Sequence, residues 1–279
     1  MVKLYNDVSY DISKIITRRY STSFSIAVGY FNSETQSAIF SIYAFVRLAD
    51  EIVDSFHEYD KNKLLNDFEN DYYKSYHEGL SLNPVLHSFQ HTVKKYELPD
   101  QLIQAFLKSM KVDLVKQGSY NKSEITDYIH GSAEAVGLMC LYVFVKGDRA
   151  LFEELKYPAM KLGSAFQKVN FLRDLKTDTQ ELGRNYFPEM DGISFNQDTK
   201  ERIIRDIEAD FSASLPGIKK LPKDVKTPVL IAYYYYLSLL NKIRNTPFTE
   251  LVNKRIRVPN FRKYLLLYKA YLVVKFRLI

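Results

Sequence analysis

Apolar side chains recur every three or four residues along almost the whole chain, and no segment shows the alternation expected of a half-buried strand. This period predicts helices over residues 9–19, 34–57, 60–77, 84–95, 99–117, 123–146, 148–156, 158–182, 199–212, 226–245 and 259–277. Prolines near predicted first turns support these starts, since a missing N–H is tolerated there: Pro84, Pro99, Pro158, Pro228 and Pro259. The segment NYFPEMDGISFNQ, residues 185–197, predicts a loop or flap. The pattern predicts an all-α protein with a single domain over residues 1–279.

The composition is that of a chain with a large core. Of the 279 residues, 46% are apolar, which suits one large domain. The single cysteine, Cys140, rules out an intramolecular disulfide and fits a reducing compartment. The first residues contain no signal-peptide core, and no stretch approaches the roughly 18 uncharged apolar residues of a spanning helix. We therefore expect a cytoplasmic protein, free or at the inner face of the membrane.

The chain is basic, with a formal charge of +6 and an isoelectric point near 9.0. The basic residues are scattered and match no zinc-binding or recognition-helix pattern, so nucleic acid is not an expected partner. Phosphorylated small molecules and anionic lipid surfaces remain as acidic partners. The 22 Tyr and 18 Phe fit either a well-packed core or a long apolar pocket.

Acidic side chains interrupt the apolar helix 34–57, in the stretch RLADEIVDSF. Tyr43, Arg47, Asp50 and Asp54 are spaced by 4, 3 and 4 residues and therefore share one helical face. Carboxylates on a core-facing helix must be paired, protonated or bound to metal. A solvated face is the common explanation for such a stripe taken alone.

A second stripe favours a metal-binding site over a solvated face. Gln167, Asn170, Asp174 and Asp178 are spaced by 3, 4 and 4 residues, and the small Gly163 lies on the same face. Two such stripes facing each other would form an all-oxygen cage without Cys or His, which selects Mg²⁺. The metal would supply the counter-charge for four carboxylates and would bridge to substrate phosphates.

A di-iron bundle is the rival metal site, and it requires Glu-x-x-His on two helices. The segments Asp54–His57 and Asp127–His130 carry Asp in place of that Glu. We therefore favour magnesium.

Five blocks in order make the chain similar to the squalene/phytoene synthase family of head-to-head prenyl transferases, from about Tyr20 to Leu272. They are YSTSFSIAVGYFNSETQSAIFSIYAFVRLADEIVD, DYIHGSAEAVGLMC, QKVNFLRDLKTDTQELGRNYFP, YYYYLSLLNKIR and KRIRVPNFRKYLLLYKAYL, of which the third is the most specific. Glu51 stands where many members have Asp, and Glu134 stands where Gly is frequent, a change that could reshape the pocket wall. The resemblance implies an isoprenoid-synthase-type helical bundle around a central cavity.

The resemblance also implies site residues. Magnesium ligands would be Asp50, Asp54, Asn170, Asp174 and Asp178. Diphosphate oxygens would be bound by Arg47, Gln167 and Arg173, and by the YSTSF residues Tyr20, Ser21, Thr22 and Ser23. A salt bridge for Arg47 and a helix cap for YSTSF are the simpler alternatives.

Other residues of these blocks have expected roles in handling the prenyl chain. Aromatic faces that shield a carbocation would come from Tyr43, Tyr128 and Tyr236, of which Tyr43 and Tyr236 could also reach phosphate. Small residues expected to keep the prenyl channel open are Gly131, Ala135 and Gly137. Arg184 and Tyr186 would anchor the flap, and a positive field would come from Arg255, Arg257 and Lys263.

The expected reaction joins two prenyl diphosphates through a cyclopropylcarbinyl diphosphate and requires several Mg²⁺ ions. Phytoene from two geranylgeranyl diphosphates is the favoured product, with squalene or dehydrosqualene from farnesyl diphosphate as the alternative; NADPH is required only for squalene. A non-catalytic helical scaffold is the alternative of another class, although both Asp pairs are intact. The apolar tail YLLLYKAYLVVKFRLI, with its basic residues, is compatible with peripheral membrane contact or with a terminal core helix.

Overall fold

The computed structural model describes residues 2–188 and 196–259, and in the C-terminal segment residues 265, 266, 268–270, 272, 273 and 276. The helices of this part are α1 (Val2–Tyr20), α2 (Thr22–Val28), α3 (Ser33–Ser55), α4 (Lys61–Glu78), α5 (Pro84–Tyr96), α6 (Asp100–Val115), α7 (Lys122–Ile129), α8 (Ala135–Val145), α9 (Arg149–Arg173), α10 (Gln197–Lys220), α11 (Lys223–Arg244) and α12 (Phe248–Leu251). Two π-helical turns, η1 (His130–Glu134) and η2 (Thr177–Glu181), follow α7 and α9. The predicted all-α class is confirmed.

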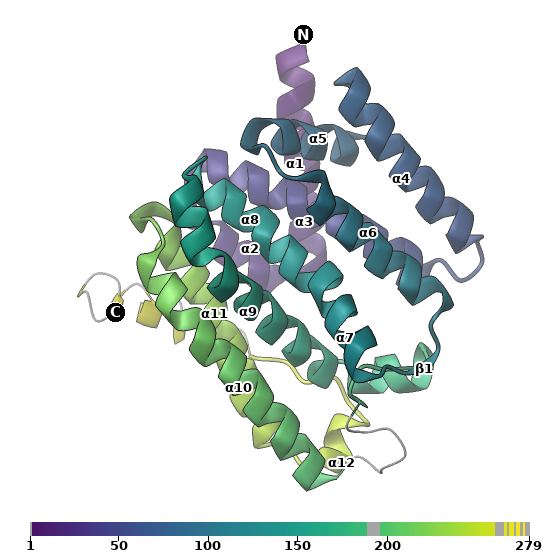
Figure 1. Cartoon of the computed structure of the whole chain (residues 1–279), viewed down its shortest axis with the longest axis vertical. Helices are drawn as coiled ribbons and strands as arrows, with labels where there is room; N and C mark the ends of the chain where they lie inside the picture. The colour runs from purple at the N-terminus through teal and green to yellow at the C-terminus, as the bar shows by residue number, and fades with distance from the viewer. Residues whose placement is uncertain are drawn as a thin grey trace.

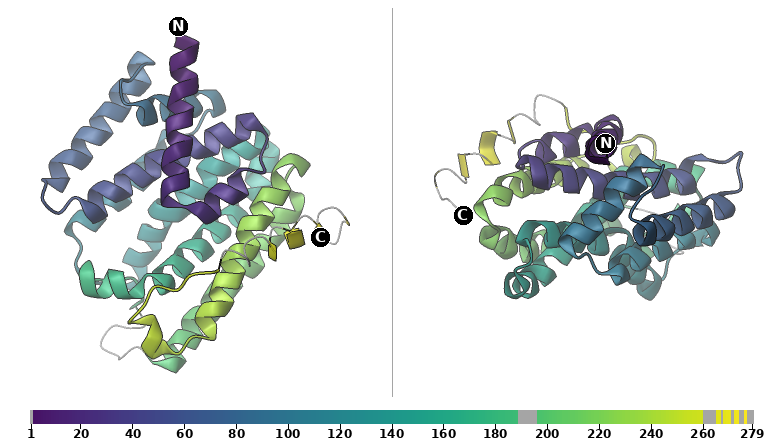
Figure 2. Two further views of the ribbon diagram at one scale, coloured as in Figure 1. Left: turned by 180° about the vertical axis from the view of Figure 1, so that it is seen from behind. Right: turned by 90° about the horizontal axis from the view of Figure 1, so that it is seen from above.

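The long helices pack side by side as one bundle. Along the face seen in Figure 1, α6, α8, α9 and α10 follow one another as neighbours, and α3 packs against both α6 and α8. Helices α1, α4 and α5 pack around α3 at the end where the N-terminus projects, as the views in Figure 2 also show. Helix α11 packs against α2, α9 and α10 and closes the other side.

Two hydrophobic clusters form the core. One gathers buried side chains of α3 to α6, with the Phe45 and Phe89 rings stacked 3.9 Å apart at its centre. The other gathers buried side chains of α7 to α11, including Phe171 and Phe211. The helices therefore bury apolar stripes on two sides of α8, and α8 itself is apolar almost all round.

Lys122–Val145, which comprises α7, η1 and α8, is the one described segment long and apolar enough to cross a membrane, and half of its most apolar stretch is buried within the fold. Core helices of water-soluble proteins commonly have this composition.

Several predicted boundaries are wrong for identifiable reasons. Residues 148–156 and 158–182 are not two helices, because α9 runs through Pro158 and ends at Arg173. The lost hydrogen bond at Pro158 is offset by tight packing: a Cβ added to Gly217 of α10 would lie 2.3 Å from the Pro158 Cβ. Helix α1 begins seven residues earlier than predicted, because it buries the small polar side chains Ser9, Ser13 and Thr17 rather than apolar ones.

Two short parallel strands lie within residues for which no strand was predicted. Gly118–Ser119 (β1) pairs with Arg184–Asn185 (β2), in register Gly118 to Arg184. The Tyr120 backbone N–H donates to the Asn185 carbonyl at 3.0 Å. The pairing ties the segment after η2 to the segment after α6. Of the predicted loop 185–197, residues 189–195 lie outside the described part, and most of the predicted helix 259–277 does too.

Candidate active site

A cavity of about 450 Å³ lies between the two hydrophobic clusters. Its lining changes along both α3 and α9 in the same order, from apolar to polar. On α9 it runs from Leu155 and Leu162 to Asn170 and Arg173, a span of 18 residues or about 27 Å of helix. Further polar lining side chains are Tyr20, Ser21, Tyr43, Arg47, Asp50, Ser132, Gln167 and Arg255. One polar end and a long apolar channel fit an amphiphilic ligand with a charged head.

The stripe on α3 points into this polar end. Tyr43, Arg47 and Asp50 line the cavity, while Asp54, one turn further, lies beyond the lining residues. The Arg47 guanidinium stands 4.4 Å over the Tyr20 ring, pairs closely with Glu51 and lies 3.9 Å from the Asp50 carboxylate. Its buried Nε has no hydrogen-bond partner within the described chain. The arginine therefore forms the expected salt bridge and retains a donor for a ligand.

Asp50 is only weakly neutralised, because Arg47 pairs more closely with Glu51 than with Asp50. Burial raises the pKa of Asp50 to about 7, and repulsion from the Asp54 carboxylate adds to burial against the weaker attraction of Arg47. About a third (35%) of its side chain is exposed, and this part faces the cavity. A carboxylate held this way gains from a cation that enters the cavity.

The stripe on α9 lines the opposite wall. Gln167, Asn170 and Arg173 line the cavity. Asp174 directly follows the end of α9, and its φ of −102° and ψ of 12° depart from helical geometry. The Arg173 Nε donates to both Asp174 oxygens at 3.0 and 3.1 Å, and the Arg255 Nε approaches Asp174 Oδ1 at 2.7 Å. Arg255, predicted to supply a positive field, thus lies at the polar end of the cavity.

Asp178 lies on η2, one turn beyond Asp174. Burial raises the pKa of Asp178 to about 8, and the charges of Asp174 and Asp54 raise it further, against Arg184 and Arg173. Asp54 and Asp178 belong to different stripes, so the two acidic faces influence each other electrostatically. Both Asp50 and Asp178 retain protons more tightly than free carboxyl groups do.

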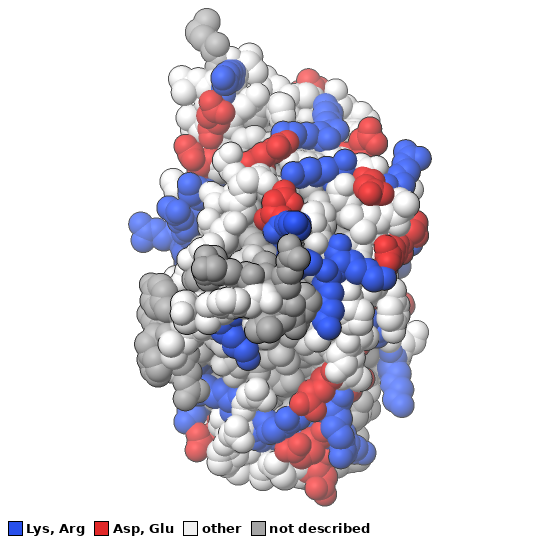
Figure 3. Space-filling model, turned by 90° about the vertical axis from the view of Figure 1, so that its left-hand side faces the viewer, with Lys and Arg blue, Asp and Glu red and all other residues white. Residues whose placement is uncertain are grey.

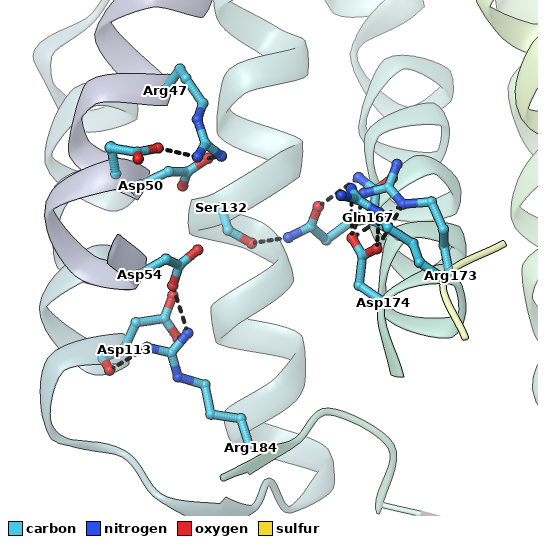
Figure 4. Close-up of polar contacts among 12 residues, drawn as sticks. Arg47, Asp50, Asp54, Asp113, Ser132, Gln167, Arg173, Asp174 and Arg184 are labelled. Atoms are coloured by element: carbon cyan, nitrogen blue, oxygen red, sulfur yellow. Dashed lines mark hydrogen bonds and ion pairs between the residues drawn. The ribbon is translucent and has the colours of Figure 1, made fainter. Parts of the chain in front are cut away.

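Figure 4 shows Asp50 and Asp54 on one side of the site and Asp174 on the other, with the 3.5 Å contact from Gln167 to Ser132 between them. Within the described residues, no three His, Cys, Asp or Glu side chains come close enough together to hold an ion. Side chains of the described residues therefore do not enclose an ion by themselves, and the expected magnesium site, in which substrate phosphates complete the oxygen ligands, stays a prediction. The helices hold the two stripes apart, and this leaves room for a ligand between them.

The donors nevertheless suit magnesium. All are carboxylate or amide oxygens, and Mg²⁺ is commonly held by one or two carboxylates plus substrate phosphates. The raised pKa values of Asp50 and Asp178 mark carboxylates without sufficient positive charge nearby. Residues that could hold ions are thus the five that the resemblance implied.

Tyr43 and Tyr236, two of the three predicted aromatic residues, line the cavity and each stacks on a phenylalanine. Tyr43 stacks on Phe24 at 4.9 Å, and burial raises its pKa to about 12. Tyr236 stacks on Phe166 at 4.0 Å and donates a 3.3 Å hydrogen bond to Asn170 Oδ1. Both hydroxyls stay protonated near neutral pH.

Tyr128 also lines the cavity, but its hydroxyl is committed elsewhere, donating to Asp113 Oδ2 at 2.6 Å. Burial raises its pKa well above the ordinary value. Its ring is thus available to the cavity while its oxygen is already paired.

The YSTSF segment has two functions. Ser21 caps α2, accepting from the Phe24 N–H at 3.4 Å, as the simpler alternative predicted. Tyr20 and Ser21 line the cavity as well, whereas Thr22 and Ser23 are not among its lining residues. Helix α2, which was not predicted, explains why only the first half of the segment reaches the cavity.

Three expectations about small or variable residues need correction. Gly131 and Ala135 do not line the cavity, although Gly137 does. A Cβ on Gly131 would lie 2.4 Å from the Ala105 carbonyl, so this glycine allows η1 to approach α6. Glu134 is absent from the cavity wall too, and pairs instead with His130 at 3.1 Å.

The predicted flap anchors lie deeper than expected. Arg184 and Tyr186 are buried around β2, where both contact Asp113. Residues 189–195 of the predicted flap lie outside the described part, so the anchoring of a flap stays a prediction. Arg257 is exposed and accepts a hydrogen bond from Lys242 through its backbone carbonyl, and Lys263 lies outside the described residues.

Asp113 is the residue that sequence reasoning missed. It is a lone carboxylate in the stretch MKVDLV of α6, with no acidic partner at helical spacing. The available signal was a charged residue at a position where the apolar period requires a buried one.

The sequence profile of the squalene/phytoene synthase family matches residues 17–262. This chain belongs to that family. It is 25% identical to a phytoene synthase of Arthrospira platensis, over 93% of this chain and 91% of the relative. It is 27% identical to phytoene synthase 3, chloroplastic, of Zea mays, over 92% of this chain and 64% of the relative.

Solved structures share the fold of this family member. The crystal structure of a dehydrosqualene synthase in complex with a ligand superposes with a TM-score of 0.84 at 21% identity, covering 97% of this chain and 98% of the other. The helical isoprenoid-synthase fold is therefore confirmed. Members of the squalene/phytoene synthase family are prenyl transferases, so this chain is an enzyme of that class.

Proposed function

We propose that this family member condenses two molecules of geranylgeranyl diphosphate head to head, forming phytoene and two diphosphates in a Mg²⁺-dependent reaction of carotenoid biosynthesis. The observation that supports it most is the cavity whose lining changes from apolar to polar along both α3 and α9, ending in Arg47 and Asp50 on α3 and in Asn170 and Arg173 on α9. The phytoene synthases among the relatives favour the C20 substrate.

The chain's own residues would first bind the diphosphate heads. Arg47, with its free Nε, and Arg173 line the polar end and supply donors suited to diphosphate oxygens. Mg²⁺ would be held by Asp50 and Asp54 of the stripe on α3 and by Asn170, Asp174 and Asp178 of the second stripe. Bound magnesium neutralises the charge that develops on a departing diphosphate.

The apolar channel would then protect the cation. Ionisation of an allylic diphosphate leaves a carbocation, which water would convert to an alcohol. The stacked rings of Tyr43 and Tyr236 present aromatic faces to the cavity and stabilise positive charge without attacking it. The high pKa of Tyr43 keeps its hydroxyl neutral and weakly nucleophilic. The cation would join the second prenyl chain with loss of one proton, giving a cyclopropylcarbinyl diphosphate. Departure of its diphosphate, rearrangement and loss of a second proton would complete the hydrocarbon.

We propose peripheral membrane contact for the same chemical reason, since the product is insoluble in water. In the C-terminal segment, Leu265, Tyr268 and Phe276 are exposed, and Lys269 lies 4.7 Å from the Tyr234 ring of α11. Lys and Arg side chains predominate in the middle of the same side of the molecule (Figure 3). Cosedimentation with anionic but not zwitterionic vesicles tests this association.

One assay tests the reaction. Purified protein is incubated with Mg²⁺ and C20 or C15 diphosphate, with and without NADPH, and the extracted hydrocarbon is identified. We expect phytoene from the C20 substrate without NADPH. Squalene or dehydrosqualene from the C15 substrate would reassign the chain length, and absence of diphosphate release in every combination would favour a non-catalytic scaffold.

Two variants connect the assay to the site. Asp50→Ala and Asp174→Ala are expected to abolish turnover while retaining the helical content measured by circular dichroism. Asp127→Asn, a change of an exposed aspartate on α7, is the control and is expected to retain activity. Wild-type turnover in either alanine variant would contradict the metal assignment.

A further inference from the structure

Asp113 is a buried carboxylate surrounded by donors. It lies in the last turn of α6, and the residue is only 7% exposed. Oδ2 accepts the Tyr128 hydroxyl at 2.6 Å, while Oδ1 accepts those of Tyr120 at 3.3 Å and Tyr186 at 3.4 Å. Three hydroxyl donors from three separate segments thus converge on one carboxylate.

The three tyrosines form a single stack. Tyr186 lies 5.2 Å from both Tyr120 and Tyr128, centroid to centroid, and is nearly parallel to Phe171 of α9 at 4.1 Å. Their arrangement around Asp113 therefore links α6, α7, β2 and α9. A displacement of the carboxylate would affect all these elements.

Arg184 connects this cluster to the acidic stripe of α3. Its side chain is 6% exposed; Nη2 donates to the Asp113 backbone carbonyl at 2.8 Å, and Nη1 lies 3.8 Å from Asp113 Oδ1. The same Nη1 donates to Asp54 Oδ1 at 3.1 Å. Among the described residues, this contact leaves Asp54 Oδ2 available to a ligand.

The Arg184 guanidinium is charged and buried, so it needs an anion within the fold. Asp113 supplies it: with one negative charge on each of Asp54 and Asp113, the guanidinium is held between two carboxylates. Without Asp113, the guanidinium would be free to reorient toward Asp54 and occupy both of its oxygens.

We propose that Asp113 is a positioning residue for the condensation, holding Arg184 so that Asp54 keeps one oxygen free, and holding the Tyr128 ring against the cavity wall. This inference rests on the proposed function. Asp113 touches no reacting atom and acts through these two side chains.

The test compares Asp113→Asn with the wild type and with Asp127→Asn. Asn keeps the size of the side chain but removes its charge. We expect kcat/KM to fall by about 10- to 100-fold, the usual effect of changing a residue that orients a metal ligand. We also expect a comparable weakening of Mn²⁺ binding in the presence of inorganic diphosphate, measured by electron paramagnetic resonance. Asp127→Asn is expected to leave both unchanged.

A second set of variants separates positioning from folding. Arg184→Gln removes the guanidinium that would otherwise occupy Asp54. The double variant Asp113→Asn/Arg184→Gln is therefore expected to bind Mn²⁺ as well as Arg184→Gln alone, and more tightly than Asp113→Asn, because Asp113 acts through Arg184. If Asp113→Asn does not fold, Tyr120→Phe and Arg184→Lys carry the test. Tyr120→Phe removes one donor to Asp113 outside the cavity, and Arg184→Lys cannot span Asp54 and the Asp113 carbonyl together. Each is expected to weaken Mn²⁺ binding while melting within a few degrees of the wild type.

Unchanged Mn²⁺ affinity and unchanged kcat/KM in folded Asp113→Asn, or in both substitutes, would overturn the inference. So would additive effects in the double variant. Failure of the wild type to release diphosphate from any substrate would overturn the proposed function instead, and the Mn²⁺ measurements would still decide whether Asp113 orients Asp54.

Discussion

Replacing Asp50 by Asn should stabilise the metal-free protein while removing its activity. The folded protein raises the pKa of Asp50 from 3.8 to about 7, first through burial and then through repulsion by Asp54. The folded state therefore binds this proton more tightly than the unfolded state does. The stability of the metal-free wild type must fall as pH rises from about 4 to 7, and the full penalty is present above pH 7.

The magnitude follows from this shift. A difference of about three pKa units corresponds to roughly 4 kcal/mol at 1.4 kcal/mol per unit, as an upper bound. Because about a third (35%) of the Asp50 side chain is exposed, screening reduces the figure to roughly 1–2 kcal/mol. At about 2–4 °C per kcal/mol for a chain somewhat smaller than this one, Asp50→Asn should raise the melting temperature by roughly 2–8 °C at pH 8.

The assay is thermal denaturation in EDTA at pH 5 and pH 8, followed by the same scans with Mg²⁺ and inorganic diphosphate. Asp50→Asn should melt higher than the wild type at pH 8, with a smaller difference at pH 5, and ligand should stabilise only the wild type. Asp127→Asn serves as the matched control. A variant that melts lower than the wild type at pH 8 in EDTA, or that keeps full turnover, would refute the reasoning.

Three further predictions concern the cavity and its walls. Gly131→Ala should lower the free energy of unfolding by about 1–3 kcal/mol, since the new Cβ would lie 2.4 Å from the Ala105 carbonyl. Gly137→Ala, with its nearest contact at 3.3 Å, should lower it less. Urea denaturation measures both, and the reverse order would contradict the packing role of Gly131. Tyr236→Phe should lower kcat roughly two- to tenfold, because it loses the hydrogen bond to Asn170, while the helical content stays unchanged. Steady-state kinetics measure this effect, and an undiminished kcat would show that the Tyr236 hydroxyl does not contribute to the reaction. Cys140 is half-buried in the cavity wall, where desolvation raises its pKa to about 12. Native protein at pH 8 should therefore react with a thiol reagent far more slowly than denatured protein, and equal rates would contradict the raised pKa.

The periodicity of apolar residues was sufficient to predict the helical class and most helices, because each long helix buries one continuous stripe. The periodicity failed to predict helix bounds where polar residues or proline pack in the core. Helix α1 packs through Ser9, Ser13 and Thr17, with Ser13 Oγ 2.8 Å from Ser88 Oγ. The apolar residues of its first turns, Val2, Leu4 and Val8, are exposed, so their spacing did not mark the buried face. Pro158 was taken as a helix start, although contact with Gly217 allows α9 to continue through it.

The two acidic stripes were determined by the sequence alone, since spacings of three and four residues place side chains on one face of any helix. Their placement on opposite sides of the site was decided only by the tertiary structure, which sets α3 and the end of α9 on either side of the contact from Gln167 to Ser132. Residue spacing could not predict the hydrogen bonds around Asp113 either. Its partners come from segments up to 73 residues away, and only the packing of α6, α7 and β2 brings their hydroxyls to one carboxylate.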